Sequence, residues 1–195
     1  VGLKKDLNIE YTYPEATFTE GSYRTVRDAI SDIQDIEPGK EVTDSYFTLP
    51  PHPEAQGLEK ELRGRCLHNH ITTATRETAL SRFKALKAGE NFHDLSPELK
   101  TTYSNAERTQ NTIYMRLKYD EPSGTVVNVR KSMWIHPELD RAISIREAAR
   151  LQTFPDSFIF EGTKDSQYQQ VGNAVPPFLA KAVAESIISI LDQVQ

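Results

Sequence analysis

The sequence is poor in the residues that stabilise small secreted proteins and metal centres. Its 195 residues include one cysteine, Cys66, which excludes an internal disulfide framework and fits a reducing compartment. The five histidines have no zinc-binding spacing with cysteine, so we expect no metal site. No apolar run reaches the length of a membrane span, and the N-terminus has no signal-peptide pattern. We therefore expect a cytoplasmic protein without a membrane partner.

Charge is present in both signs but is unevenly distributed along the chain, whose net charge is −5. Residues 1–61 carry 6 Lys and Arg against 13 Asp and Glu, whereas residues 62–89 carry 6 against 1. Residues 106–150 carry 8 against 6. A middle segment that binds phosphates while the ends pack elsewhere would give this distribution, and so would a solvated basic helix face.

Turn and capping signals predict a mixed α/β chain with three segments, residues 1–60, 61–140 and 141–195. In the first segment, Thr25 and Asp28 have the spacing of a capping box at the start of a short helix. A proline-rich stretch follows, which is typical of an exposed connector.

The middle segment is expected to be a small unit rich in strands and loops. Apolar residues recur every third position within residues 78–88, which predicts a helix, and Gly89 is a stop signal. Residues 111–118 alternate apolar and polar side chains, and residues 125–130 follow a Pro-Ser-Gly turn. Both stretches are predicted to be strands.

The third segment has the sharpest local signals. Ser144 and Glu147 form a full capping box at the start of a short helix. The prolines at 176–177 lack amides and fit the first turn of a long C-terminal helix. Just before them, Gly172 allows a close approach to a backbone or ligand, and Asn173 can cap a helix or point into a pocket. Taken alone, these residues are also consistent with a purely structural cap.

Two of these stretches together closely resemble one enzyme family. Residues 141–156, Arg-Ala-Ile-Ser-Ile-Arg-Glu-Ala-Ala-Arg-Leu-Gln-Thr-Phe-Pro-Asp, and residues 170–177, Gln-Val-Gly-Asn-Ala-Val-Pro-Pro, are similar to the ninth and tenth motifs of the bacterial DNA (cytosine-5) methyltransferases. Residues 122–126, Pro-Ser-Gly-Thr-Val, resemble the Thr-aliphatic pair of that family's target recognition domain. Residues 1–4 resemble the segment after the eighth motif. The likeness is specific from about residue 113 onward.

The resemblance implies methyl transfer from S-adenosylmethionine to carbon 5 of a cytosine flipped out of double-stranded DNA. It also implies a target recognition domain flanked by segments that complete a Rossmann-like domain. The family's Gly-rich cofactor loop, Pro-Cys nucleophile, Glu-Asn-Val acid and Arg-x-Arg motif are missing from these 195 residues, and Cys66 follows Arg rather than Pro. We therefore expect the C-terminal recognition portion of a nucleoid-associated enzyme, inactive without an N-terminal catalytic half. The chain also opens on Val1, not Met.

Candidate DNA contacts come from the basic middle segment and from the predicted strands. Lysine and arginine side chains position a protein on phosphates, and arginine, asparagine and glutamine can read guanine or adenine edges. Each such residue also fits an ordinary solvated surface. The candidates are Arg82, Lys84, Lys87, Arg116, Thr125, Val126 and Arg130, with Asn105, Gln110 and Asn128 as possible adenine readers.

The remaining site residues are implied by the resemblance. Asn173 and Ala174 match the positions that line the S-adenosylmethionine pocket. Arg146, Glu147 and Arg150 match residues of the ninth motif that brace the recognition unit, and we expect them to form buried ion pairs. A stand-alone DNA-binding module or the small subunit of a split methyltransferase remains the alternative function.

Overall fold

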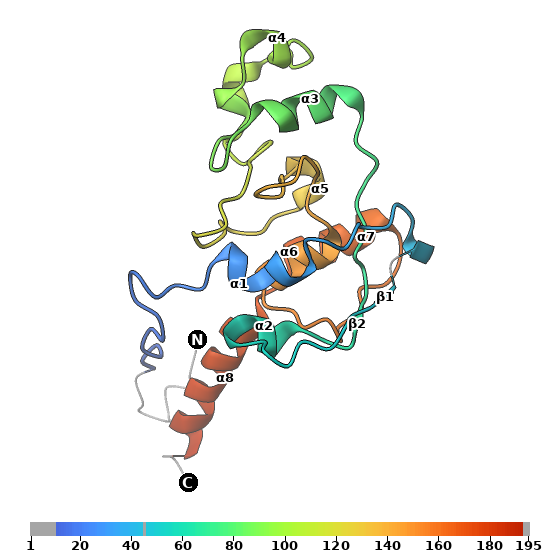
Figure 1. Ribbon diagram of the computed structural model, residues 1–195. Helices are drawn as coiled ribbons and strands as arrows, with labels where there is room; N and C mark the ends of the chain where they lie inside the picture. The colour runs from blue at the N-terminus through green and yellow to red at the C-terminus, as the bar shows by residue number, and fades with distance from the viewer. Residues whose placement is uncertain (1–10, 45, 193–195) are drawn as a thin grey trace. The chain divides into compact units, whose positions relative to one another are not determined.

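The computed structural model describes residues 11–44 and 46–192 (Figure 1). The resemblance of residues 1–4 to a family segment lies outside the described residues. The described chain divides into two units, one formed by residues 11–23 with 175–192 and the other by residues 24–174. Each unit is described by itself.

The larger unit begins with the predicted capped helix. The Thr25 side chain accepts from the Asp28 amide while the Asp28 carboxylate accepts from the Thr25 amide, which confirms the capping box of α1 (Val26–Ile30). A two-stranded antiparallel sheet pairs Phe47 with Leu67. The other elements of this part are η2 (Ser31–Ile33), η3 (Val42–Asp44), β1 (Phe47–Thr48), α2 (Gly57–Leu62) and β2 (Cys66–Leu67).

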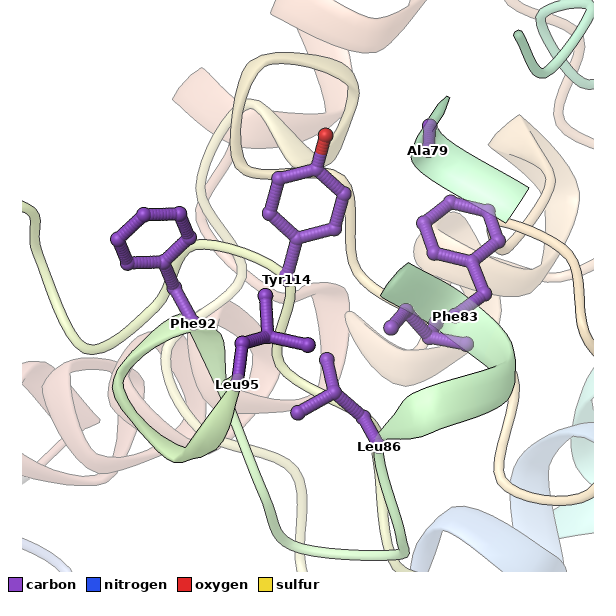
Figure 2. Close-up of a cluster of buried hydrophobic side chains, with 7 residues drawn as sticks. Ala79, Phe83, Leu86, Phe92, Leu95 and Tyr114 are labelled. Atoms are coloured by element: carbon purple, nitrogen blue, oxygen red, sulfur yellow. The ribbon is translucent and has the colours of Figure 1, made fainter. Parts of the chain in front are cut away.

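The middle of the larger unit has its own apolar cluster around the predicted helix, which the structure places at Glu77–Ala85 (α3). Figure 2 shows side chains of α3 facing Phe92, Leu95 and Tyr114. Phe83 and Phe92 have no exposed surface. The helical turns that close the cluster are short: η4 (Phe92–Asp94), α4 (Pro97–Lys100) and η5 (Ala106–Arg108).

The predicted strands of the middle segment are wrong. Residues 111–118 form turns and then a single isolated bridge between Arg116 and Ile135, because Tyr114 has a positive φ of 53° that interrupts an extended chain. Residues 125–128 have no regular structure, and α5 (Val129–Ser132) begins where a strand was expected. Within the described residues the fold is mixed α/β with only the two-residue strands β1 and β2.

Three further helices follow, and α6 (Ile145–Leu151) begins with the predicted Ser144–Glu147 capping box. Helix α6 packs on α1 and on α7 (Lys164–Asn173), and α7 also contacts α5 (Figure 1). The predicted helix entrance at residues 167–177 is partly wrong, because its first seven residues are the C-terminal part of α7. The long C-terminal helix itself is present as α8 (Pro177–Asp192).

The smaller unit consists of α8 and residues 11–23. The Tyr11 hydroxyl lies 2.8 Å from the Ser186 hydroxyl, and Tyr13 and Pro14 line an apolar cavity of about 630 Å³ against α8. An 18-residue window of the stretch Lys164–Asp192 has a mean hydropathy of 1.5, so by length and composition it could cross a membrane. The prediction that no segment is long and apolar enough to span a membrane is therefore wrong. Buried core helices of soluble proteins pass the same test, but no part of this window is buried among the described residues, and Lys181 and Glu185 form an i,i+4 ion pair inside α8.

Candidate functional site

Helix α6 carries a fully buried carboxylate at its first turn. Glu147 accepts from the Ser144 amide at 2.7 Å and receives both terminal nitrogens of Arg141 at 2.8 and 2.7 Å. Burial alone would raise the pKa of the Glu147 carboxyl, but the hydrogen bonds and charge of Arg141 outweigh it and hold that pKa at about 2. Glu147 is therefore an anion at neutral pH that fixes the segment before α6 to the helix.

Arg146, the residue before Glu147, links α6 to the 68–69 segment and to the loop after the helix. Its guanidinium donates to the carbonyls of His68 at 2.7 Å and Pro155 at 2.9 Å, and to that of Phe158. It also reaches the Asn69 side chain at 3.3 Å. Burial lowers the pKa of Arg146 to about 10, which still leaves it charged at neutral pH. The side chain organises the loop after α6 around it.

Arg150, one turn later, links α6 to α1 and to the loop after α6. It forms a bidentate pair with Asp156 at 2.9 and 2.6 Å, an ion pair with Asp32 and a hydrogen bond to the Ala29 carbonyl at 3.1 Å. All three motif residues Arg146, Glu147 and Arg150 have no exposed surface. Their partners lie up to 121 residues away in the chain, which is the geometry of bracing side chains.

The C-terminal end of α7 lies directly against the segment before α5. A Cβ atom on Gly172 would lie 2.8 Å from the Asn128 nitrogen and from the Val127 carbonyl carbon, closer than real Cβ atoms come to other atoms. The close backbone approach predicted for Gly172 is thus confirmed, and the neighbour is the chain itself. Asn173, at the end of α7, is exposed, and Ala174 is half-buried.

The family model for the C-5 cytosine-specific DNA methylase matches residues 1–189. The chain belongs to this family. It is 35% identical to the Type II methyltransferase M.DdeI of Desulfomicrobium norvegicum, with 96% of this chain and 48% of the relative covered. It is 34% identical to DNA (cytosine-5)-methyltransferase 4 of Arabidopsis thaliana, with 84% and 12% covered.

A solved E. coli prophage protein, described as a DNA modification methyltransferase, has a similar fold, with a TM-score of 0.71 at 23% identity. The similarity covers 97% of this chain and 53% of the solved one. The chain therefore spans about half the length, or less, of these three relatives.

Two of the predicted DNA-contacting residues lie in the interior of the chain. Arg82 is 4% exposed and donates to the Leu99 carbonyl at 2.8 Å and to the Tyr114 hydroxyl at 2.8 Å. Arg116 is 5% exposed, and its guanidinium donates to the Phe83 carbonyl at 2.6 Å and pairs with Asp140. Because both guanidinium groups are buried and bonded to groups inside the fold, the prediction that Arg82 and Arg116 contact DNA is wrong.

Among the other predicted DNA contacts, apart from the possible adenine readers, Val126 is buried and the rest are exposed at the surface. Lys84 and Lys87 are exposed on and just after α3, and Thr125 is exposed beside the buried Val126. Arg130 is exposed but engaged, because it pairs with Asp165 of α7 and donates to the Thr73 hydroxyl at 3.2 Å. The possible adenine readers Asn105 and Gln110 are exposed, and Asn128 is half-buried as the N-cap of α5.

Some structurally important polar residues gave no signal in the sequence. Asn69 has a positive φ of 60° and a buried amide that bonds to the Phe160 backbone and to the Gln167 side chain. Gln169 links the side chains of Asn128 and Asn173. The φ of an asparagine cannot be read from a sequence, and an isolated glutamine on a helix has no distinguishing pattern.

Cys66 lines a wide cavity of about 960 Å³, and residues 50–53 line the same cavity. Its sulfur is 3.1 Å from the Tyr46 hydroxyl, and this contact raises the pKa of Tyr46. Within the described residues, no three His, Cys, Asp or Glu side chains gather as a metal site requires.

Proposed function

We propose that this chain is the DNA-recognition portion of an enzyme that transfers a methyl group from S-adenosylmethionine to carbon 5 of cytosine in a specific DNA sequence. Its family membership supports the chemistry, because the matched family is defined by that reaction. The Type II and cytosine-5 methyltransferase relatives support DNA as the substrate. In this proposal residues 61–140 form the target recognition domain, and residues 141–195 return to the catalytic part.

The observation that carries this proposal is the backbone contact between Gly172 and the 127–128 segment. Gly172 belongs to the family-like stretch 170–177, and residues 127–128 directly follow the other family-like stretch, 122–126, more than forty residues earlier in the sequence. This close contact supports an arrangement in which the segment proposed to bind DNA packs directly against the segment proposed to line the cofactor pocket. Thr125, just before the contact in the chain, is exposed and able to reach a phosphate oxygen.

The residues at the end of α7 fit a cofactor that carries a carboxylate. The Asn173 side-chain oxygen already accepts from Gln169 at 2.7 Å, so its amide nitrogen is the group left to donate to a ligand. S-adenosylmethionine supplies the reactive methyl group when bound, and Asn173 with Ala174 would form part of the wall that holds it. Neither residue is acidic or nucleophilic, and their contribution is to bind and orient.

The nucleophilic thiolate is supplied from outside these 195 residues. Cys66 follows Arg65 instead of a proline, and its sulfur contacts the Tyr46 hydroxyl, so it does not match the Pro-Cys nucleophile of the family. In this proposal the recognition domain is held in a fixed orientation by Arg146, Glu147 and Arg150. The DNA is held by exposed Lys84, Lys87 and Thr125.

Bisulfite sequencing tests the proposal. We expect the full-length protein that contains this chain, incubated with S-adenosylmethionine and mixed-sequence DNA, to protect cytosine from deamination within one recurring sequence. The 195-residue chain alone should protect none. Protection by the chain alone would show that it contains its own nucleophile, and methylation on a base nitrogen instead of carbon 5 would contradict the proposed reaction.

A further inference from the structure

We propose that Gln169 is a positioning residue that couples DNA binding to cofactor binding, by linking the 125–128 segment to Asn173. The inference rests on the proposed function, in which the first site contacts DNA and the second lines the cofactor pocket. Gln169 itself touches neither ligand in this scheme. Its hydrogen bonds to Asn128 and Asn173 mean that restricting the motion of one asparagine restricts the motion of the other.

One face of α7 carries the contacts to the α5 region. Asp165, Gln169 and Gly172 stand at positions i, i+4 and i+7, so they lie on the same side of the helix. Asp165 pairs with Arg130, and Gly172 packs on the backbone of residues 127–128. Gln169 lies between these two fixed points. The separation of α7 from the α5 region is therefore fixed on both sides of the glutamine.

Hydrogen bonds connect three amide side chains in series. Asn128 donates from Nδ2 to Gln169 Oε1 at 2.9 Å, and Gln169 donates from Nε2 to Asn173 Oδ1 at 2.7 Å. The orientation of the first amide is set by the backbone, because Asn128 Oδ1 accepts from the Lys131 amide as the N-cap of α5. Each amide then fixes the next.

The direction of this series determines what Asn173 offers a ligand. Because its oxygen is used by Gln169, the side chain presents an N–H donor, and the matching ligand group is an acceptor such as a carboxylate. Without Gln169 the Asn173 amide can rotate and present either group. Ordering it then costs free energy each time the cofactor binds.

The three amides already form this series without a ligand, and DNA bound to the 125–128 segment would further restrict the motion of Asn128 and, through Gln169, of Asn173. A cofactor that meets an ordered Asn173 binds more tightly, and by thermodynamic linkage the cofactor tightens DNA binding by the same factor. The two ligands need not touch each other for this coupling.

The test is a titration of S-adenosylhomocysteine into the full-length protein by calorimetry, with and without a duplex that contains the methylated sequence. The coupling factor is the ratio of the two dissociation constants. For the unmodified protein we expect roughly five-fold or more tightening by DNA, the lower end of typical allosteric couplings. Gln169→Leu should bring the factor close to one.

Two variants separate the relay from general damage. Asn128→Asp keeps the oxygen that caps α5 but removes the donor to Gln169, so it should also reduce the factor, and the double variant should reduce it no further. Ser166→Ala is the control on the same helix, because Ser166 is exposed, lies outside residues 170–177 and accepts from the Gln170 amide rather than from Gln169. It should keep the full factor.

The inference is overturned if both ligands bind the unmodified protein independently, if Gln169→Leu retains the full coupling factor, or if Ser166→Ala loses it equally. Failure of the proposed function has a different signature. In that case the unmodified protein binds neither S-adenosylhomocysteine nor the duplex, and both proposals fall together.

Discussion

The guanidinium of Arg150 and the carboxylate of Asp156 form two parallel hydrogen bonds, Nε to Oδ1 at 2.9 Å and Nη2 to Oδ2 at 2.6 Å. Both side chains have no exposed surface. Asp156 also accepts from the Gly64 amide at 3.0 Å, so the pair connects α6 to the turn before β2. This relationship holds together segments that are up to 92 residues apart.

Asp156→Asn should be strongly destabilising because it leaves the buried Arg150 charge with only Asp32 as an ionic partner. Breaking one side of a buried pair costs about 3 kcal/mol or more of unfolding free energy. Urea denaturation measures it. The control is Glu61→Gln, which breaks an exposed pair with Arg24 and should cost no more than about 1 kcal/mol. Equal losses in the two variants would contradict the bracing role of Arg150.

Much of the local structure could be predicted because the interactions involved are local. The capping boxes at Thr25 and Ser144 bond residues three apart, so the sequence contains both partners. The close approach at Gly172 was predictable in kind but its neighbour was not, since the neighbour is more than forty residues away.

The errors arose where distant partners decide the outcome. Arg82 and Arg116 are arginines in a basic segment, a pattern that normally indicates solvent exposure. Here carbonyls of Leu99 and Phe83 satisfy their donors inside the fold. The alternation of residues 111–118 predicts an outward-facing Tyr114, yet its ring lies in the apolar cluster (Figure 2). No local pattern in the sequence indicates such contacts.

Acid should destabilise the larger unit in two stages. Burial lowers the pKa of His136 from its ordinary 6.5 to about 4 and also lowers that of His70. The unfolded chain therefore binds protons before the folded one as pH falls from 6.5 toward 4, and stability is lost across that window. Glu147, whose pKa is lowered from 4.5 to about 2, adds a second loss as pH falls from 4.5 toward 2.

The variant His136→Asn tests the first stage, because asparagine can still accept from the Glu138 and Leu139 amides but does not titrate. We expect unfolding free energy, measured by urea titration from pH 7 to pH 4.5, to fall less steeply in the variant. A residual slope should remain from His70. If the two proteins lose stability in parallel, His136 is not a source of the acid sensitivity.

Lys84→Glu with Lys87→Glu should weaken DNA binding by the full-length protein. Each contact with a phosphate contributes about 0.9 to the slope of log affinity against log salt, so the slope should fall by roughly 1.8. Fluorescence anisotropy at several salt concentrations measures both quantities. Lys60→Glu, on α2, is the control for a change of charge and should have a smaller effect. An unchanged slope in the double variant would indicate that the two lysines are only a solvated surface.

Asn173→Ala should raise the dissociation constant of S-adenosylmethionine for the full-length protein. The loss of one hydrogen bond to a charged group, about 1.5–3 kcal/mol, corresponds to roughly ten-fold or more. Affinity for DNA without cofactor should hardly change. Calorimetry that showed intact cofactor binding together with a lower melting temperature would instead make Asn173 a helix-terminating residue without a binding role.

The most direct test is an exchange of recognition domains. Residues 61–140 of the full-length protein are replaced by the corresponding segment of M.DdeI, and the methylated sequence is read by bisulfite sequencing. We expect cytosine-5 methylation to continue and the methylated sequence to become that of M.DdeI. Continued methylation of the original sequence would contradict the assignment of DNA recognition to this chain.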